Sequence, residues 1–259
     1  MTYNTIVVEK VDQIGKITLN RPEAYNTFTI PLALELNQAL LEMDQNPEIA
    51  VVIINGNGKN FCAGIDVKYV DGKSHAEYVD WHGLMGRMNL TMTEMKKPVI
   101  ASVHNLAVAN GVGIVAAADL AIAGESARFG ATAVNIGLFC MGPAVPLLKN
   151  IGRKRTMELI LTGDLIDAKT ALSWGLINKV VKDDMLEEET MKWAKKLADK
   201  SRQAIALGKA CFYKTEDLNL KQGLDMADQY FASLCASQDG EEGVRAFLEK
   251  REPRYRYPD

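Results

Sequence analysis

The amino-acid sequence predicts an α/β protein in which parallel strands alternate with helices ahead of a helical C-terminal third. Two observations support this class. Continuous β-branched runs bounded by glycine, of which AVVIING at 50–56 is the clearest, are typical of strands covered on both faces. An amphipathic helical pattern stands between this run and an earlier strand, which is the order that α/β layering produces.

The chain opens with a strand pair and an amphipathic helix. TIVVEKV and GKITLN alternate apolar and polar residues on either side of residues 12–14, which predicts a hairpin. Pro22 ends the second strand. From Pro31, a residue suited to the first helical turn, the apolar spacing predicts a helix that ends before Pro47.

The middle of the chain holds two further buried strands, predicted at 99–103 and 120–123. The polar stretch 71–82 ahead of them is expected to be a loop or a mobile helix, of the kind that often lines a site. Between the two strands, GVGIVAAA predicts a helix whose first residue is Asn110 or Gly111.

Helical patterns continue from about residue 153 to the C-terminal end. Gly163 and Gly175 stand where left-handed C-terminal caps are expected. Asp167 is expected to cap the start of the helix that follows it, because a carboxylate there can accept from unpaired backbone N–H groups.

Composition and charge exclude several classes of function. The chain of 259 residues carries 30 Lys and Arg against 33 Asp and Glu, so its formal net charge of −3 favours neither nucleic acid nor an anionic membrane as a partner. The N-terminus has no signal-peptide pattern, and Asp119 interrupts the longest apolar run, so no membrane span is expected. Four cysteines without CxxC spacing predict reduced thiols in the cytoplasm, no disulfide framework and no metal site.

Two glycine-marked turns, FCAGID at 61–66 and VANGVG at 108–113, each follow a buried strand, and the second opens a helix. Backbone N–H groups at such places have no partner inside a helix, and the helix dipole adds partial positive charge. Two of these N–H groups can converge on one oxygen and stabilise an enolate or oxyanion. The alternative interpretation is that the glycines only permit tight turns.

Two rival sites do not fit the sequence. Residues 111–116 match GxGxxA, but the dinucleotide fingerprint requires its first glycine directly after the first strand of a βαβ unit, and here seven residues intervene. A serine-hydrolase site needs a serine nucleophile and a histidine base, and Ser102 and His104 lie too close together along one strand to pair in these roles. We therefore expect neither a redox cofactor nor a serine-hydrolase site.

Five motifs follow one another along the chain: LNRPEAYNTF, VVIINGNGKNFCAGID, KKPVIASVHNLAVANGVGIVAAADLAIAGESARFGATAVNIGL, LTGDLIDAKTALSWGLINKVV and EGVRAFLEKR. Their order resembles the enoyl-CoA hydratase/isomerase (crotonase) family over nearly the whole chain. The resemblance implies one domain over 1–259, with a crotonase (ClpP/crotonase-like) spiral of ββα repeats at 1–200. A C-terminal helical part at 201–259 would support a homotrimer or homohexamer. The substrate would be an acyl-CoA thioester of fatty acid metabolism, with coenzyme A as part of the substrate and no separate cofactor.

By this resemblance, the backbone N–H groups of Ile65 and Asn110 would hold the thioester oxygen, beside Gly64 and Gly111. The residues near coenzyme A would be Ala24 at the pantetheine and Ala63, Asp66 and Val67 at the adenine. Phe247 and Lys250 resemble C-terminal residues that reach a coenzyme A, often that of a neighbouring subunit. Lys250 could equally be a solvated lysine.

Hydratases of the family use two glutamates as general acid and base, and this chain has Gly113 and Ala133 at the matching positions. Neither residue can move a proton, a contribution that is typically about 10²–10⁴-fold in rate. The sequence therefore favours an acyl-CoA enzyme of the lyase or isomerase kind that does not use two-glutamate hydration.

Cys140, in the segment GLFCMGPAVP, is the remaining candidate for catalysis. A thiolate beside an oxyanion hole could attack a thioester, which makes a thioester hydrolase one alternative. His82 or His104 would have to approach the thiol in space. The other interpretation of Cys140 is a small buried hydrophobe. A non-catalytic acyl-CoA-binding or auxiliary protein is a further alternative.

Overall fold

The computed structural model describes residues 3–70, 72–255 and 257. Within these residues, a six-stranded sheet with the order β1-β2-β3-β4-β6-β9 forms the centre of the molecule. β1 and β2 pair as an antiparallel hairpin and the other neighbours pair parallel, which confirms the α/β class and the opening hairpin. The strands are β1 (Ile6–Val11), β2 (Ile14–Leu19), β3 (Val51–Gly56), β4 (Val99–Val103), β6 (Leu120–Gly124) and β9 (Lys179–Val181).

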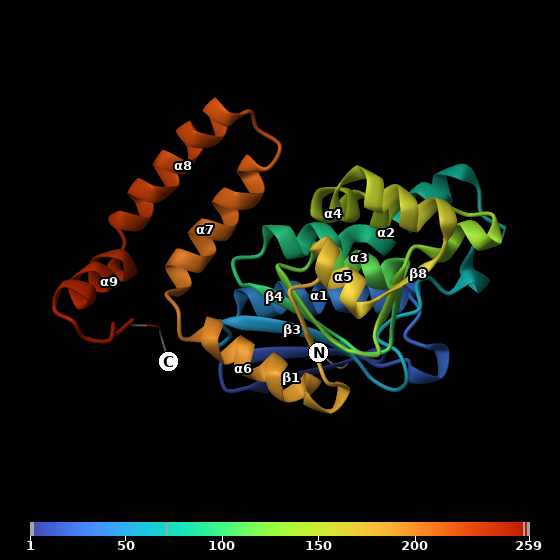
Figure 1. Ribbon diagram of the computed structural model, residues 1–259, viewed down its shortest axis with the longest axis horizontal. Coiled ribbons are helices and arrows are strands. Elements are labelled where there is room, and N and C mark those ends of the chain that lie inside the picture. The colour runs from blue at the N-terminus through green and yellow to red at the C-terminus, as the bar shows by residue number, and fades with distance from the viewer. Residues whose placement is uncertain (1–2, 71, 256, 258–259) are drawn as a thin grey trace.

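Helices cover both faces of this sheet (Figure 1). One face packs against α1 (Ile30–Gln45), α2 (His75–Glu94), α3 (Asn110–Ala117) and α4 (Met141–Thr162), and the other against α6 (Leu186–Ala198). The first four residues of β3 are β-branched because both faces of the strand are covered: Val52 and Ile54 join one core, while Val51 and Ile53 join the other. Alternation along a strand sends neighbouring side chains to opposite faces, so both sets must be apolar.

A second, small sheet holds the loops that precede α3. It joins β5 (Leu106–Val108), β7 (Arg128–Gly130) and β8 (Leu165–Asp167) in that order. The sequence did not predict these strands, because three residues are too few to display a period. The remaining elements are η1 (Pro22–Ala24), η2 (Val67–Tyr69), η3 (Thr132–Ile136), η4 (Asp183–Met185) and α5 (Ala168–Trp174).

The structure gives exact bounds for two helices of the middle of the chain. The stretch 71–82, expected as a loop or mobile helix, becomes α2 from His75, because Ser74 and Glu77 form a capping box there. Residue 71 lies outside the described residues. The helical pattern expected from about residue 153 is the second segment of α4, which Gly152, with φ of 77° and ψ of 167°, separates from a first segment that begins at Met141. The first segment was not predicted. The caps expected at Gly163, Asp167 and Gly175 are confirmed.

The C-terminal helices form an arm that projects from the core (Figure 1). This C-terminal arm consists of α7 (Arg202–Thr215), α8 (Leu220–Cys235) and α9 (Gln238–Leu248). A buried ion pair fastens α7 to the core: Nζ of Lys209 lies 2.6 Å from Oδ2 of Asp119, and the Tyr213 hydroxyl donates to Oδ1 of Asp119 at 3.0 Å. Among the described helices, none is both long and apolar enough to cross a membrane.

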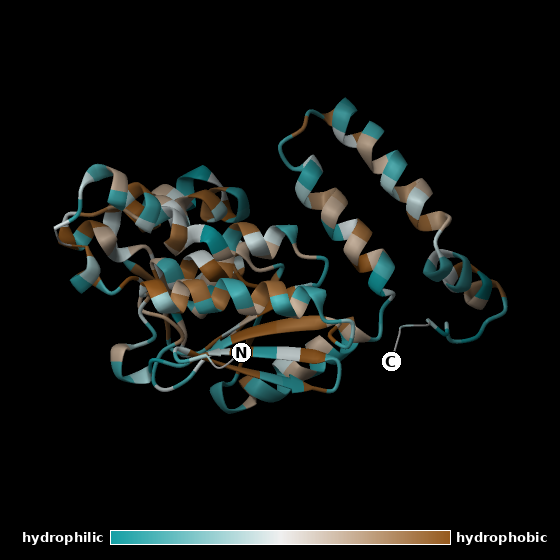
Figure 2. Cartoon of the chain, turned by 180° about the vertical axis from the view of Figure 1, so that it is seen from behind, coloured by the Kyte–Doolittle hydropathy of each residue, from teal (hydrophilic) through white to brown (hydrophobic). Residues whose placement is uncertain are grey.

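The C-terminal arm leaves large apolar side chains exposed. Figure 2 shows that α7 and α8 carry apolar segments, drawn in brown, between hydrophilic ones. Phe231 on α8 is 69% exposed and Phe247 on α9 is 82% exposed. Other exposed apolar side chains of the arm are Phe212, Leu220, Leu224, Val244 and Leu248.

Candidate functional site

The two glycine-marked turns of the sequence meet in space. The Val108 N–H donates to the Cys62 carbonyl at 3.0 Å, so the segment FCAGID runs beside β5. Gly64, with φ of +94°, then lies against Ala109, because a Cβ added to Gly64 would stand 2.8 Å from the Ala109 Cβ. The residue after Gly64 therefore lies next to the first turn of α3.

The backbone N–H groups of Ile65 and Asn110 donate to no acceptor within the described residues, and the same holds for those of Gly64, Gly111 and Val112. Asn110 is the first residue of α3, where the N–H has no partner inside the helix. The paired neighbours are Ala63, Asp66, Ala109 and Gly113, whose acceptors are the carbonyl oxygens of Tyr25, Phe28, Gly130 and Ala109.

The backbone at the start of α3 is strained and tightly packed. Ala109 has φ of 49° and ψ of −114°, a region that glycine favours and that costs other residues about 1–3 kcal/mol. Gly111 admits no side chain, because an added Cβ would stand 2.4 Å from the Cys62 carbonyl oxygen. Strain and close backbone approach of this kind cluster at functional sites.

The Asn110 side chain has a contact that the sequence did not suggest. Its Nδ2 donates to the carbonyl oxygen of Met85 on α2 at 3.0 Å. This bond joins the first turn of α3 to the middle of α2. The family resemblance assigned Asn110 only a backbone role, and the partner could be known only from how α2 packs.

The two positions at which the family resemblance expects glutamates are Gly113 and Ala133. Gly113 is buried, and a Cβ added to it would stand 3.4 Å from the Pro143 Cβ in the first turn of α4. Ala133, in η3, is half-buried, and its carbonyl oxygen accepts from the Leu138 N–H. The described contacts around these two residues supply no acid in place of the glutamates.

Cys140 lies close to Ala133, but its environment disfavours a thiolate. The side chain is 4% exposed at the start of α4. Burial raises the pKa of the Cys140 thiol, and a hydrogen bond with the Ala133 backbone only partly opposes this effect. A thiol acts as a nucleophile only after it loses its proton, so the site does not favour thioester attack.

His82 and His104, the two histidines considered as partners of the Cys140 thiol, lie on different sides of the central sheet. His82 on α2 packs against Gly142, because a Cβ added to Gly142 would stand 3.3 Å from Nε2 of His82. His104 lies on the other side of the sheet, where its Nε2 is 3.0 Å from the Gly58 carbonyl oxygen. It shares with Ser102 a cavity of about 220 Å³ against α6. Ser102 bonds there to Thr190, so Ser102 and His104 form no catalytic pair with each other.

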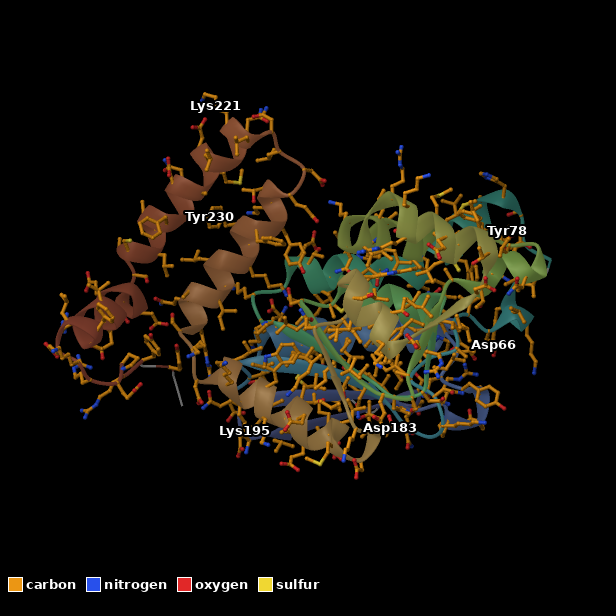
Figure 3. The ribbon with its side chains drawn as sticks, in the orientation of Figure 1. Asp66, Tyr78, Asp183, Lys195, Lys221 and Tyr230 are labelled. Carbon is orange, nitrogen blue, oxygen red and sulfur yellow. The ribbon has the colours of Figure 1, made fainter. Side chains whose placement is uncertain are left out.

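The residues expected at coenzyme A gather beside η1 and η2. Asp66 accepts from the Lys68 N–H and lies 3.4 Å from the Arg21 guanidinium, while Val67 is 52% exposed. Ala24 ends η1, and its carbonyl oxygen accepts from the Thr27 hydroxyl. Figure 3 shows Asp66 and Tyr78 at one end of the molecule and Tyr230 of α8 at the other.

Sequence analysis did not identify Asn26, whose side chain holds together the loops beside η1. Asn26 is fully buried, and its Nδ2 donates to the carbonyl oxygens of Asn57 and Asn60 at 2.9 and 2.8 Å. Its Oδ1 accepts from the Arg21 N–H at 2.8 Å. Because its amide joins the two loops that precede the site, it sets the position of Ala24 relative to the segment at 61–66. Its place in NRPEAYN was the only signal available in the sequence.

Phe247 and Lys250 lie far from Asp66 within one chain. They stand at the end of α9, which occupies the end of the molecule opposite to Asp66 (Figures 1 and 3). The structure therefore does not bring them to the site of their own chain. Among the residues placed by the structure, no cluster of three or more His, Cys, Asp or Glu could hold a metal ion.

Comparison with known proteins places the fold in a family. Residues 9–258 match the family model described as enoyl-CoA hydratase/isomerase. The chain is similar to the mouse "Enoyl-CoA hydratase domain-containing protein 3, mitochondrial", with 36% identity over 93% of this chain and 81% of that protein. It is also similar to a "Probable enoyl-CoA hydratase" of Rhizobium meliloti, with 34% identity over 99% of this chain and 100% of that protein.

Solved structures agree with the sequence comparison. The crystal structure of an enoyl-CoA hydratase from Mycobacterium smegmatis superposes with a TM-score of 0.94, at 33% identity, over 97% of this chain and 99% of that chain. Human enoyl-CoA hydratase domain-containing protein 3 gives a TM-score of 0.91 at 34% identity, over 97% of this chain and 100% of that chain. The fold is the crotonase fold, and the chain belongs to the enoyl-CoA hydratase/isomerase family.

Proposed function

We propose that this protein is an enzyme that binds an acyl-CoA thioester and stabilises an enolate or oxyanion with the backbone N–H groups of Ile65 and Asn110. The observation that supports this proposal best is that these two N–H groups are unpaired within the described residues, on two loops that touch. Donors fixed in advance and aimed at one oxygen need no reorganisation when charge develops there.

The proposed reaction is of the lyase or isomerase kind, but it is not hydration by a pair of glutamates. By the family resemblance, Gly113 and Ala133 would occupy the positions of that pair. The relatives are named as hydratases, and these names describe the relatives rather than this chain. The proposed difference lies in the proton-transfer groups, whereas the thioester would be bound in the same way.

Coenzyme A would enter as part of the substrate, with no separate cofactor. We place its pantetheine near Ala24 and its adenine near Ala63, Asp66 and Val67. Phe247 and Lys250 would reach the coenzyme A of a neighbouring copy, in a homotrimer or homohexamer. The apolar side chains that the C-terminal arm exposes support such self-association, since large uncovered apolar surfaces mark interfaces. A cytoplasmic place in fatty acid metabolism remains a prediction, and some relatives are named as mitochondrial.

A panel of CoA thioesters tests the proposed function. Thermal-shift measurements should show stabilisation by several acyl-CoA esters, because a ligand that binds only the folded state raises its melting temperature. Mass spectrometry of the products should then show turnover of at least one ester. Stabilisation without any turnover would favour the non-catalytic binder instead. Failure of every ester to bind would contradict both.

Hydrolysis through Cys140 is the weaker alternative, because burial raises the pKa of that thiol. Hydration of crotonyl-CoA at a rate typical of the family, retained after Cys140 is replaced, would contradict the proposed departure from hydratase chemistry.

A further inference from the structure

An enolate held by Ile65 and Asn110 requires a group that takes a proton from the acyl chain. We propose that His82 is this catalytic base and removes the proton from the carbon next to the thioester carbonyl. The inference rests on the proposed function and adds to it the residue that the missing glutamates leave unassigned. Its basis is the place of His82 between α2 and the first turn of α4.

The first turn of α4 brings His82 near the position of the first glutamate. Gly142 packs against the imidazole, since an added Cβ would stand 3.3 Å from Nε2 and 3.4 Å from Cε1 of His82. Pro143, the next residue, packs against Gly113. Neighbouring Cα atoms are about 3.8 Å apart. The imidazole and Gly113 therefore contact neighbouring residues in the first turn of α4.

Helix α2 is also fixed relative to the oxyanion donors. The Met85 carbonyl oxygen accepts from the Asn110 side chain at 3.0 Å, and Asn110 supplies one of the two proposed N–H donors. His82 and Met85 are three residues apart, so they lie on the same side of α2. The hydrogen bond between the Asn110 side chain and the Met85 carbonyl oxygen thus keeps His82 within about one turn of α2 from the residue that contacts Asn110.

The other titratable groups near His82 are less suited to the role. Burial raises the pKa of Cys140, which keeps the thiol protonated. The Tyr78 hydroxyl donates to the Val70 carbonyl oxygen at 2.6 Å. Asp80 is two residues from His82 and points to a different side of the helix. The His82 ring has no hydrogen-bond partner within the described residues, and its side chain is exposed, so it can take up a proton and return it to water.

The proposed step is a balanced proton transfer. The carbon–hydrogen bond next to the carbonyl breaks, and its proton goes to a ring nitrogen of His82. The electron pair becomes the double bond of the enolate, whose negative oxygen is held by the N–H groups of Ile65 and Asn110. In deuterated water the imidazolium exchanges its proton, and the reverse step returns deuterium to the carbon.

Deuterium exchange into butyryl-CoA tests this proposal. The wild-type protein in deuterated water should incorporate deuterium next to the carbonyl faster than buffer alone, as followed by mass spectrometry. His82→Gln should lower the exchange rate by at least about 100-fold, the lower range for loss of a general base. The matched control is His75→Gln on the same helix, which should stay within about twofold of wild type.

Two further variants separate catalysis from structure. In His82→Ala, added imidazole should restore part of the exchange, because the site is open to solvent; a structural role would show no such rescue. Gly142→Ala should keep the fold, since alanine favours a helix, but should slow exchange several-fold by displacing the imidazole.

Exchange at the wild-type rate in His82→Gln would overturn the proposal, as would binding of butyryl-CoA by the wild type without any exchange. The first outcome leaves the proposed function intact, because it concerns the base alone, whereas the second also favours the non-catalytic binder over the proposed enzyme. Failure of the wild type to bind any acyl-CoA would instead contradict the proposed function and the base together.

Discussion

Gly111 holds a position in α3 that no other residue can occupy without moving the loop at 61–66. A Cβ there would stand 2.4 Å from the Cys62 carbonyl oxygen, and a backbone atom cannot turn aside as a flexible side chain can. Gly111→Ala should therefore lower the free energy of unfolding by about 1–3 kcal/mol, the usual cost of overpacking. Urea unfolding measures this loss.

Gly83→Ala is the matched control for that substitution. Gly83 also lies within a helix, but nothing stands within 4 Å of a Cβ added there. Alanine should stabilise this position by up to about 1 kcal/mol, because it favours the helix more than glycine does. Equal effects of the two substitutions would contradict the close approach of α3 to Cys62.

The residues of the site differ in how far the sequence could reveal them. The meeting of the two turns that carry Ile65 and Asn110 could be expected from their glycines and from the family motif, whereas the role of their backbone N–H groups stays a proposal. The bond from the Asn110 side chain to Met85 could not be expected, since it depends on how α2 packs against α3. The raised pKa of Cys140 could not be predicted either. It results from burial of the thiol, and burial depends on the folded structure rather than on the neighbouring residues in the sequence.

Lys97 ties the end of one helix to the start of a strand. Its Nζ donates to the carbonyl oxygens of Met43 and Asn46 at the end of α1, and β4 begins two residues later. Burial lowers the pKa of Lys97 to about 8. These hydrogen bonds hold the C-terminal end of α1 next to the start of β4.

The lowered pKa of Lys97 predicts a pH dependence of stability. Above pH 8 the folded protein loses this proton, whereas the unfolded chain keeps it to about pH 10.4. The unfolded state then binds more protons, so stability rises with pH in this window. The free energy of unfolding of wild type relative to Lys97→Met should therefore increase between pH 7.5 and 9.5. The same comparison with the exposed Lys96→Met should show little change, and a decrease for Lys97→Met would contradict the assignment.

Long elements were predictable, and short ones were not. The strands at 51–56 and 99–103 and the helix from residue 30 show clear periods in the sequence. The three-residue strands β5, β7 and β8 have no period and exist because they pair with one another. For helix α2 the sequence left a loop and a mobile helix open, because its first turns are exposed and polar; the capping box of Ser74 and Glu77 marks the start of the helix.

At the scale of the whole molecule, the site and the C-terminal arm lie at opposite ends. The arm is fastened to the core through Lys209, Tyr213 and Asp119, and Asp119 follows directly on the last turn of α3. The same helix therefore begins at the proposed oxyanion donors and ends beside the anchor of the arm. The single-domain organisation over 1–259 and the assembly into a trimer or hexamer stay predictions.

The central claim is that the Asn110 backbone N–H polarises a thioester carbonyl. The most direct measurement is difference infrared spectroscopy of an acyl-CoA labelled with carbon-13 at its carbonyl. Binding to wild type should move the carbonyl band to lower wavenumber. Asn110→Pro, which removes the N–H at a position where proline is tolerated, should lose most of this shift, whereas Asn110→Ala, which removes only the side chain, should keep it. A wild-type complex with no shift, or an Asn110→Pro complex with the full shift, would contradict the account.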